Sequence, residues 1–208
     1  MNDFSIEKEF DGPVIGIDEV GRGPLAGPVV SCGCYFKDYN FLNNSLDFIK
    51  DSKKISAKKR FSVLKYLNKL KNNKILKYNL GIASVREIDD LNILNATKLS
   101  MRRVVDKFNL SNATLIIDGN FKLNYKNYKE KSIVRGDQIS ISIAAASIIA
   151  KVHRDRLMSI LSTKFEGFDW HKNSGYGTTK HIREIYKVGP TIHHRKTFEP
   201  IKSLIPTK

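Results

Sequence analysis

Residues 14–30 read VIGIDEVGRGPLAGPVV, and this stretch decides the fold. Its first part is rich in Val and Ile, which predicts a buried strand over residues 14–20. The glycines and prolines of residues 21–27 predict a turn, and residues 28–36 predict a second strand. Asp18 and Glu19 stand at the end of the first strand, so two adjacent acids are expected directly before the turn.

Further strands and helices are predicted to alternate beyond this stretch. The predicted strands cover residues 75–84, 114–117 and 132–134, and the predicted helices cover residues 56–71, 86–108, 138–161 and 180–187. Ser56 is expected to cap the first helix, whose apolar side includes Phe61, and Leu91 and Leu94 are expected on the apolar side of the second. A loop over 175–179 and an irregular tail complete the chain. This order predicts an α/β fold with a mixed sheet flanked by helices.

The chain of 208 residues is strongly basic, with 36 Lys and Arg against 21 Asp and Glu and a net charge of +15. Such a charge attracts polyanions, so a nucleic acid is the leading candidate partner. A lysine-rich proteome explains the same composition equally well. Charge alone therefore leaves both interpretations open.

The cellular setting is predicted from what the chain lacks. Residues 1–12 are polar and acidic, unlike a signal peptide. The longest apolar stretch, 139–150, is interrupted by serines and is too short to cross a bilayer. Cys32 and Cys34 are expected to share one face of a strand as free thiols in a reducing cytosol. A cytoplasmic protein with one main domain and no membrane contact is expected.

Carboxylates recur at the ends of predicted elements. Asp118 ends the strand at 114–117 as Asp18 ends the first, and Asp137 precedes the long helix. Together with Glu19, four such groups could hold two hard divalent cations about 4 Å apart, an arrangement used for phosphoryl displacement. Taken singly, each has a simpler interpretation: Asp18 and Glu19 on a solvated turn, Asp118 in an Asp-Gly turn, and Asp137 as a helix N-cap.

Other residues beside these acids suit a phosphate backbone or a sugar. Gly21, Arg22 and Gly23 offer close backbone approach, N–H groups and a guanidinium, although a simple tight turn is the alternative. Tyr176 lies between two glycines, where it could contact a 2′-OH or simply pack over a loop. The basic runs at 51–54 and 58–60 could follow a phosphate backbone or form a solvated helix face. The histidines at 181, 193 and 194 lack a His-Glu-x-x-His pattern and are expected to be surface or core residues rather than zinc ligands.

The whole constellation resembles one family, the type 2 ribonucleases H. The matching segments are GIDEVGRGPLAGPV at 16–29, DSKK at 51–54, IDGN at 117–120, GD at 136–137, SIAAASIIAKV at 142–152, RDR at 154–156, GYGT at 175–178, His181 and GPT at 189–191. They follow the family's order and spacing from near residue 14 to near residue 200. The first segment and the alanine-rich segment are individually quite specific.

The resemblance implies a ribonuclease H-like fold, with a catalytic core over residues 1–165 and a C-terminal helical extension over 166–208 that contributes to substrate recognition. It implies Mg²⁺ or Mn²⁺ held by Asp18, Glu19, Asp118 and Asp137 as the catalytic residues. It implies that Gly21, Arg22, Gly23 and Tyr176 read the 2′-OH at an RNA–DNA junction. The resemblance implies more weakly that Ser52, Lys53, Ser147 and Lys151 contribute to substrate binding.

The implied activity is cleavage of the RNA strand of RNA–DNA hybrids and cleavage 5′ of ribonucleotides embedded in DNA duplexes. Two-metal hydrolysis would leave 5′-phosphate and 3′-hydroxyl ends. The resemblance implies that this activity serves DNA replication and ribonucleotide excision repair.

Departures from the family pattern are His153, Gln138-Ile139 and Lys122-Leu123. A nuclease of the same fold without 2′-OH selectivity and a non-catalytic basic nucleic-acid-binding protein are the alternatives. The type 3 enzymes resemble this class but carry an extra N-terminal domain, so the dozen or so residues before the first strand argue against a type 3 enzyme. A monomer is expected.

Overall fold

A five-stranded mixed sheet forms the centre of the protein, for which a computed structural model describes residues 3–40, 56–126 and 128–205. The strand order is β3-β2-β1-β4-β5. The strands are β1 (Val14–Val20), β2 (Val29–Phe36), β3 (Leu76–Ala83), β4 (Thr114–Asp118) and β5 (Lys129–Ile133). The pairings β1–β2 and β2–β3 are antiparallel, whereas β1–β4 and β4–β5 are parallel. The predicted mixed sheet is confirmed.

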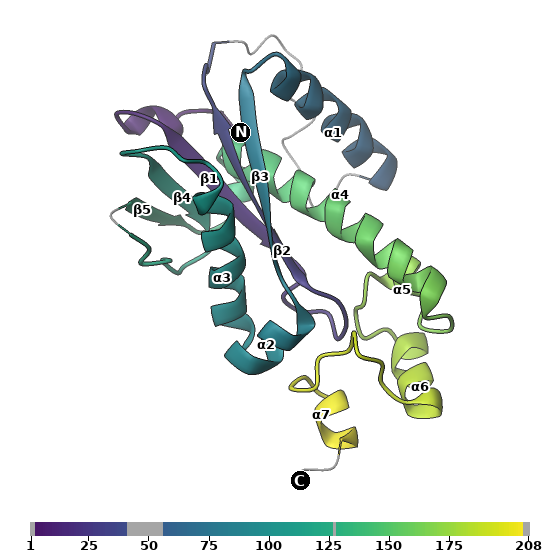
Figure 1. The fold of residues 1–208 in the computed structure, drawn as a ribbon. Helices are drawn as coiled ribbons and strands as arrows, with labels where there is room; N and C mark the ends of the chain where they lie inside the picture. The colour runs from purple at the N-terminus through teal and green to yellow at the C-terminus, as the bar shows by residue number, and fades with distance from the viewer. Residues whose placement is uncertain (1–2, 41–55, 127, 206–208) are drawn as a thin grey trace.

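Helices cover both faces of this sheet (Figure 1). On one face, α4 (Ile141–Lys164) packs on β1 and β2, with α1 (Ala57–Asn72) beside it. On the other face, α3 (Ile93–Asp106) packs on β2 and β3. Alternate strand residues therefore enter two separate apolar layers, as expected of a sheet that is buried on both sides. Cys32 and Cys34 are buried free thiols in the α4 layer, as their spacing predicted.

The helix predicted over 86–108 is two helices, α2 (Val85–Leu91) and α3. Asn92 separates them with a φ of 67°, and its side chain accepts a hydrogen bond from the Asn95 N–H at 3.1 Å. Asn is one of the residues that tolerates this left-handed region and also caps helices well. Because of this break, Leu91 and Leu94 lie exposed rather than on the apolar side.

Helix α1 begins after Ser56, whose hydroxyl accepts from the Lys59 N–H at 3.3 Å as predicted. Phe61, expected on its apolar side, is 53% exposed, and Val63 is buried instead. The strand predicted at 132–134 is β5, which begins earlier at Lys129 and ends at Ile133. Its alternate side chains are exposed lysines, so apolar content alone underestimates this edge strand.

Helix α4 starts three residues later than predicted. Its N-cap is Ser140, which accepts from the Ile143 N–H at 3.2 Å, so the interpretation of Asp137 as the cap is wrong. The buried Glu7, in the short helix η1 (Glu7–Glu9), adds a carboxylate at this helix end and accepts from the Ser142 N–H at 3.0 Å. A negative charge there is favourable because the N-terminus of a helix is partially positive.

The C-terminal part of the chain packs around the far end of α4 (Figure 1). It contains α5 (Trp170–Asn173), α6 (Thr179–Val188) and α7 (Ile201–Leu204); α6 was predicted, and α5 and α7 were not. Their apolar residues form one cluster with Leu25, Ala26 and Met158, so the loop after β1 belongs to this cluster. In the described part of the chain, no helix has the length and apolar character to cross a membrane.

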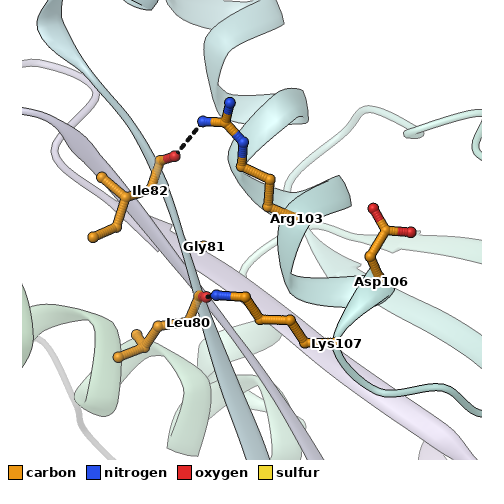
Figure 2. A pocket seen from close by; sticks show the side chains of 6 residues that line it. All are labelled: Leu80, Gly81, Ile82, Arg103, Asp106 and Lys107. Atoms are coloured by element: carbon orange, nitrogen blue, oxygen red, sulfur yellow. Dashed lines mark hydrogen bonds between the residues drawn. The ribbon is translucent and has the colours of Figure 1, made fainter.

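The free edge of the sheet at β3 is covered by two cations (Figure 2). Arg103 donates to the Ile82 carbonyl at 2.7 Å, and Lys107 donates to the Leu80 carbonyl at 2.7 Å. Charged side chains on an edge strand oppose pairing with a second sheet. Between β3 and α3 these residues line a pocket together with Gly81 and Asp106. None of the predicted site residues that the structure describes lines this pocket.

Candidate active site

Asp18 and Asp118 lie side by side at the ends of two parallel strands. The ladder between β1 and β4 ends with Ile17 opposite Ile117, and the two aspartates are the next residues on each strand. Both isoleucines enter the α3 layer, so alternation turns the aspartates toward the α4 side. Asp18 is only 2% exposed, which contradicts the interpretation of a solvated turn.

Asp137 is connected to this pair through its neighbour. The short helix η3 (Gly136–Gln138) carries it, and the Gly136 N–H donates to Asp118 Oδ1 at 2.7 Å. A Cβ on Gly136 would lie 2.6 Å from the terminal methyl group of Ile143, so a larger residue here would have to displace that side chain. Asp137 is 2% exposed. Three predicted carboxylates therefore gather at the end of β1 and β4 next to the start of α4.

Glu19 alternates to the opposite side of β1 from Asp18. Its Oε1 lies 3.3 Å from Arg22 Nη1, so the acid and the loop guanidinium form an ion pair. Within the described residues, no three His, Cys, Asp or Glu side chains are arranged closely enough to hold a metal ion. The structure thus brings Asp18, Asp118 and Asp137 to one region and pairs Glu19 with Arg22, and it does not assemble the four acids into a closed ligand set.

The Gly21–Gly23 segment and Tyr176 are neighbours, although 153 residues separate Gly23 from Tyr176 in the sequence. A Cβ on Gly23 would lie 3.6 Å from Tyr176 Cε1. Both Arg22 and Gly23 are exposed, and Tyr176 is 46% exposed. The ring thus packs beside the loop after β1 and is also accessible, so packing over a loop and contact with a sugar both stay open. An aromatic ring and a glycine backbone form one accessible surface.

Gly21 is required for a reason that the sequence did not suggest. Its φ is +98°, and a Cβ on it would lie 2.2 Å from Nε of the buried Arg154. The glycine therefore accommodates a side chain from beneath the loop, whereas the sequence interpretation had assigned it to phosphate approach.

The weaker substrate-binding predictions have different outcomes. Ser147 is buried on α4, and Lys151 lies half-buried on the same helix, where it donates to Asp155 Oδ1 at 2.7 Å. Ser52 and Lys53, with the rest of the 51–54 motif, lie outside the described residues. In the run at 58–60, Lys58 and Lys59 are exposed at the start of α1.

A buried histidine pair supports the tyrosine loop. The Thr191 N–H donates to His194 Nδ1 at 2.9 Å, so the proton of a neutral His194 lies on Nε2 and is directed at His181 Nε2, 3.0 Å away. The Trp170 indole N–H also donates to His181 Nε2, at 3.0 Å, and His181 Nδ1 in turn donates to the Tyr176 carbonyl at 2.8 Å. Burial lowers the pKa of both histidines, that of His194 to about 4. These are core histidines, as predicted.

Comparison with known proteins decides the family. The family model described as Ribonuclease HII matches residues 15–200. The chain belongs to the ribonuclease HII family. The ribonuclease HII of Ehrlichia canis (strain Jake) is 46% identical over 98% of this chain and 97% of that protein. The ribonuclease HII of Wolbachia pipientis subsp. Culex pipiens (strain wPip) is 48% identical over 97% of this chain and 98% of that protein.

The fold agrees with this family assignment. The solved ribonuclease HII of Archaeoglobus fulgidus, in a complex with PCNA, has a TM-score of 0.73 at 25% identity and covers 95% of this chain and 98% of that chain. The mixed sheet with flanking helices is therefore the ribonuclease H fold, as the sequence resemblance implied. As a ribonuclease HII family member, the chain is an enzyme, a ribonuclease H-type endonuclease and hence a hydrolase.

Proposed function

We propose that this member of the ribonuclease HII family cleaves the RNA strand of RNA–DNA hybrids and nicks DNA duplexes 5′ of an embedded ribonucleotide. The observation that supports this most is the position of the Tyr176 ring next to Gly23, five residues after Asp18. A 2′-OH is what distinguishes RNA from DNA at a single nucleotide. A phenol hydroxyl and backbone N–H groups on one exposed surface can recognise a sugar and its phosphate together.

Divalent cations are the cofactors we propose, Mg²⁺ or Mn²⁺. The donor set fits them, because Asp18, Glu19, Asp118 and Asp137 supply only carboxylate oxygens, the ligands that these hard cations prefer. Bound cations would make the attacking water more acidic and would stabilise the departing oxygen. Hydrolysis of this kind would leave 5′-phosphate and 3′-hydroxyl ends. The solved ribonuclease HIII named Bst-RNase HIII contains Mn²⁺, at 20% identity to this chain.

The protein's own groups then bind and orient the nucleic acid. Arg22, exposed beside Glu19, is placed to contact a phosphate with its guanidinium. The net charge of +15 attracts the duplex and makes its binding dependent on salt. Residues 166–208 contribute Tyr176, so we assign part of substrate recognition to the C-terminal extension. Its separation from a core at 1–165, a monomeric state and a cytoplasmic location remain predictions.

The test uses a labelled DNA duplex with one ribonucleotide, an otherwise identical all-DNA duplex and an RNA–DNA hybrid, each with Mg²⁺, Mn²⁺ or EDTA. We expect a metal-dependent nick 5′ of the ribonucleotide and cleavage of the hybrid, with the all-DNA duplex intact. Cleavage of both DNA duplexes would indicate a nuclease without 2′-OH selectivity. Binding without cleavage in any metal would contradict the proposed activity.

Tyr176→Ala tests the recognition of the 2′-OH. We expect it to slow cleavage at the single ribonucleotide by about tenfold or more, because a stacking and hydrogen-bonding group is lost. Tyr186→Ala, a substitution of an exposed tyrosine on α6, is the matched control. Wild-type rates in Tyr176→Ala would remove the proposed role.

A further inference from the structure

Two arginines lie fully buried beneath the loop that follows β1. Arg154, on α4, donates from Nε to the Pro28 carbonyl at 3.0 Å and from Nη2 to the Ala26 carbonyl at 3.0 Å. Arg195 donates from Nη1 to the Arg22 carbonyl at 2.7 Å and from Nη2 to the Gly21 and Gly27 carbonyls. Five carbonyls of one short loop thus point inward to two guanidinium groups.

Neither guanidinium has an acid as its partner. Among the described residues, no carboxylate forms an ion pair with either arginine; their acceptors are backbone carbonyls. Burial lowers the pKa of Arg154 to about 10 and that of Arg195 to about 9, so both remain protonated at neutral pH. Asp155 acts on Arg154 and Asp89 acts on Arg195 electrostatically without an ion pair, while the two guanidinium groups repel each other. Burying a charge is costly, and here hydrogen bonds to backbone carbonyls offset that cost.

The inward carbonyls determine where the N–H groups of the loop point. In a trans peptide, the C=O of one residue is antiparallel to the N–H of the next. Because the Gly21 and Arg22 carbonyls face Arg195, the N–H groups of Arg22 and Gly23 face the opposite way, toward solvent. Within the described part of the chain, neither N–H donates to an acceptor. Successive outward N–H groups of this kind bind anions.

Arg154 also joins this loop to the tyrosine loop. Its Nη1 donates to the Ser174 carbonyl at 2.8 Å, two residues before Tyr176. The Leu25 N–H donates to the Gly175 carbonyl at 2.8 Å, which makes a second connection between the two loops. One guanidinium therefore spans both segments that form the exposed surface around Gly23 and Tyr176.

We propose that Arg154 and Arg195 are positioning residues for recognition of the ribonucleotide, because they turn the Arg22 and Gly23 N–H groups outward and fix this loop relative to Tyr176. The inference rests on the proposed function, since it concerns the same surface. Lysine cannot replace either arginine in this role, because a single amine does not reach three carbonyls in a fixed fork.

The first experiment compares Arg154→Lys with wild type on the single-ribonucleotide duplex and on a long hybrid, below the unfolding temperature of each protein. A single ribonucleotide offers one productive register, whereas a hybrid offers many. We expect kcat/KM to fall about tenfold more on the single ribonucleotide than on the hybrid, because a small displacement of positioning groups is costly to catalysis. Arg86→Lys, on the exposed surface of α2, is the control and should match wild type. A folded Arg154→Lys with an unchanged ratio would overturn the proposal.

A double-mutant cycle separates positioning from general loss of structure. If Arg154 acts through Tyr176, then Arg154→Lys should cost little further on the single ribonucleotide once Tyr176→Ala is present. A full additional tenfold loss in that background would contradict the coupling. If Arg154→Lys does not fold, Arg195→Lys tests the same loop, because its contacts are with the Gly21, Arg22 and Gly27 carbonyls.

Amide hydrogen exchange gives a readout that does not need cleavage. The hydrogen-bonded amides of Leu25, Ala26 and Gly27 should exchange faster in Arg154→Lys and Arg195→Lys than in Arg86→Lys, with the sheet unchanged. A wild-type protein that cleaves neither duplex would reject the proposed function, while faster exchange limited to this loop would still support the positioning role. Unchanged exchange in both arginine variants would overturn it.

Discussion

Asp18 and Asp118 lie at the ends of adjacent strands, whereas Gly21 and Gly23 lie on a loop that two buried arginines hold from below. The first region concentrates negative charge on rigid elements, and its neighbours are the sheet and α4. The second region places positive charge beneath a glycine backbone and depends on contacts from α4 and from the C-terminal segment. The two regions meet where β1 ends.

Under the proposed function, the first region would carry the chemistry and the second the recognition of the substrate. An Asp→Asn substitution, which replaces one carboxylate oxygen by an amide NH₂ group, should change the fold little at these positions. The strands are held in place by their apolar neighbours. A change in the loop region alters recognition and stability together, because the same arginine contacts serve both. Substitutions in each region test this separation, and the largest expected effect is at Asp18.

Asp18→Asn should reduce cleavage of every substrate by about a thousandfold or more, because it removes one of the charges that the proposed cations require. Binding of the hybrid should be largely retained, since it arises from the basic surface. The measurements are single-turnover cleavage and a binding titration in parallel. Asp90→Asn, a change of an exposed aspartate on α2, is the control. Undiminished turnover in Asp18→Asn would refute the assignment.

Arg195→Met should lower the free energy of unfolding by about 3 kcal/mol, because it leaves buried carbonyls of the loop without a donor. Urea denaturation measures this value. Lys196→Met, a substitution of the exposed neighbouring residue, should change it little. A loss as small as that of the control would show that Arg195 does not hold the loop.

The histidine pair predicts that the loop region weakens in acid. His194 has a folded pKa of about 4, below the usual value of 6.5, so the unfolded chain binds more protons between these two values. Stability is therefore fully present above pH 6.5 and is lost as the pH falls toward 4, by about 2 kcal/mol for this residue. Denaturation of wild type and His194→Gln across this range tests it, with His171→Gln as an exposed control. An equal pH dependence in all three proteins would contradict the buried, neutral pair.

Local patterns predicted the strand-end region well. Strand β1 has the predicted bounds, and Asp18 and Asp118 follow directly on the last parallel pair of β1 and β4, so the two predicted acids lie on neighbouring strands. The break at Asn92 was missed because an apolar period continues across it, and only the backbone angle reveals it. The helix cap at Ser140 was missed because Asp137 is an equally good capping residue by type.

The supports of the loop region could not be predicted. Arg154 lies within a charged stretch of a long helix and Arg195 in an irregular tail, so both resemble surface residues in sequence. Their burial results from contacts across more than 120 residues of sequence, as in the bond from Arg154 to Pro28. The one available signal was the pair Gly21 and Gly27, because the absence of a Cβ at both leaves room for the Arg154 side chain.

The central claim is that the aspartates at the ends of β1 and β4 hold divalent cations, and Mn²⁺ binding tests it most directly. Calorimetry would compare wild type, Asp118→Asn and the Asp90→Asn control without nucleic acid. The account predicts that wild type and Asp90→Asn bind Mn²⁺ equally and that Asp118→Asn binds it much more weakly. Equal binding by Asp118→Asn and wild type would contradict the account.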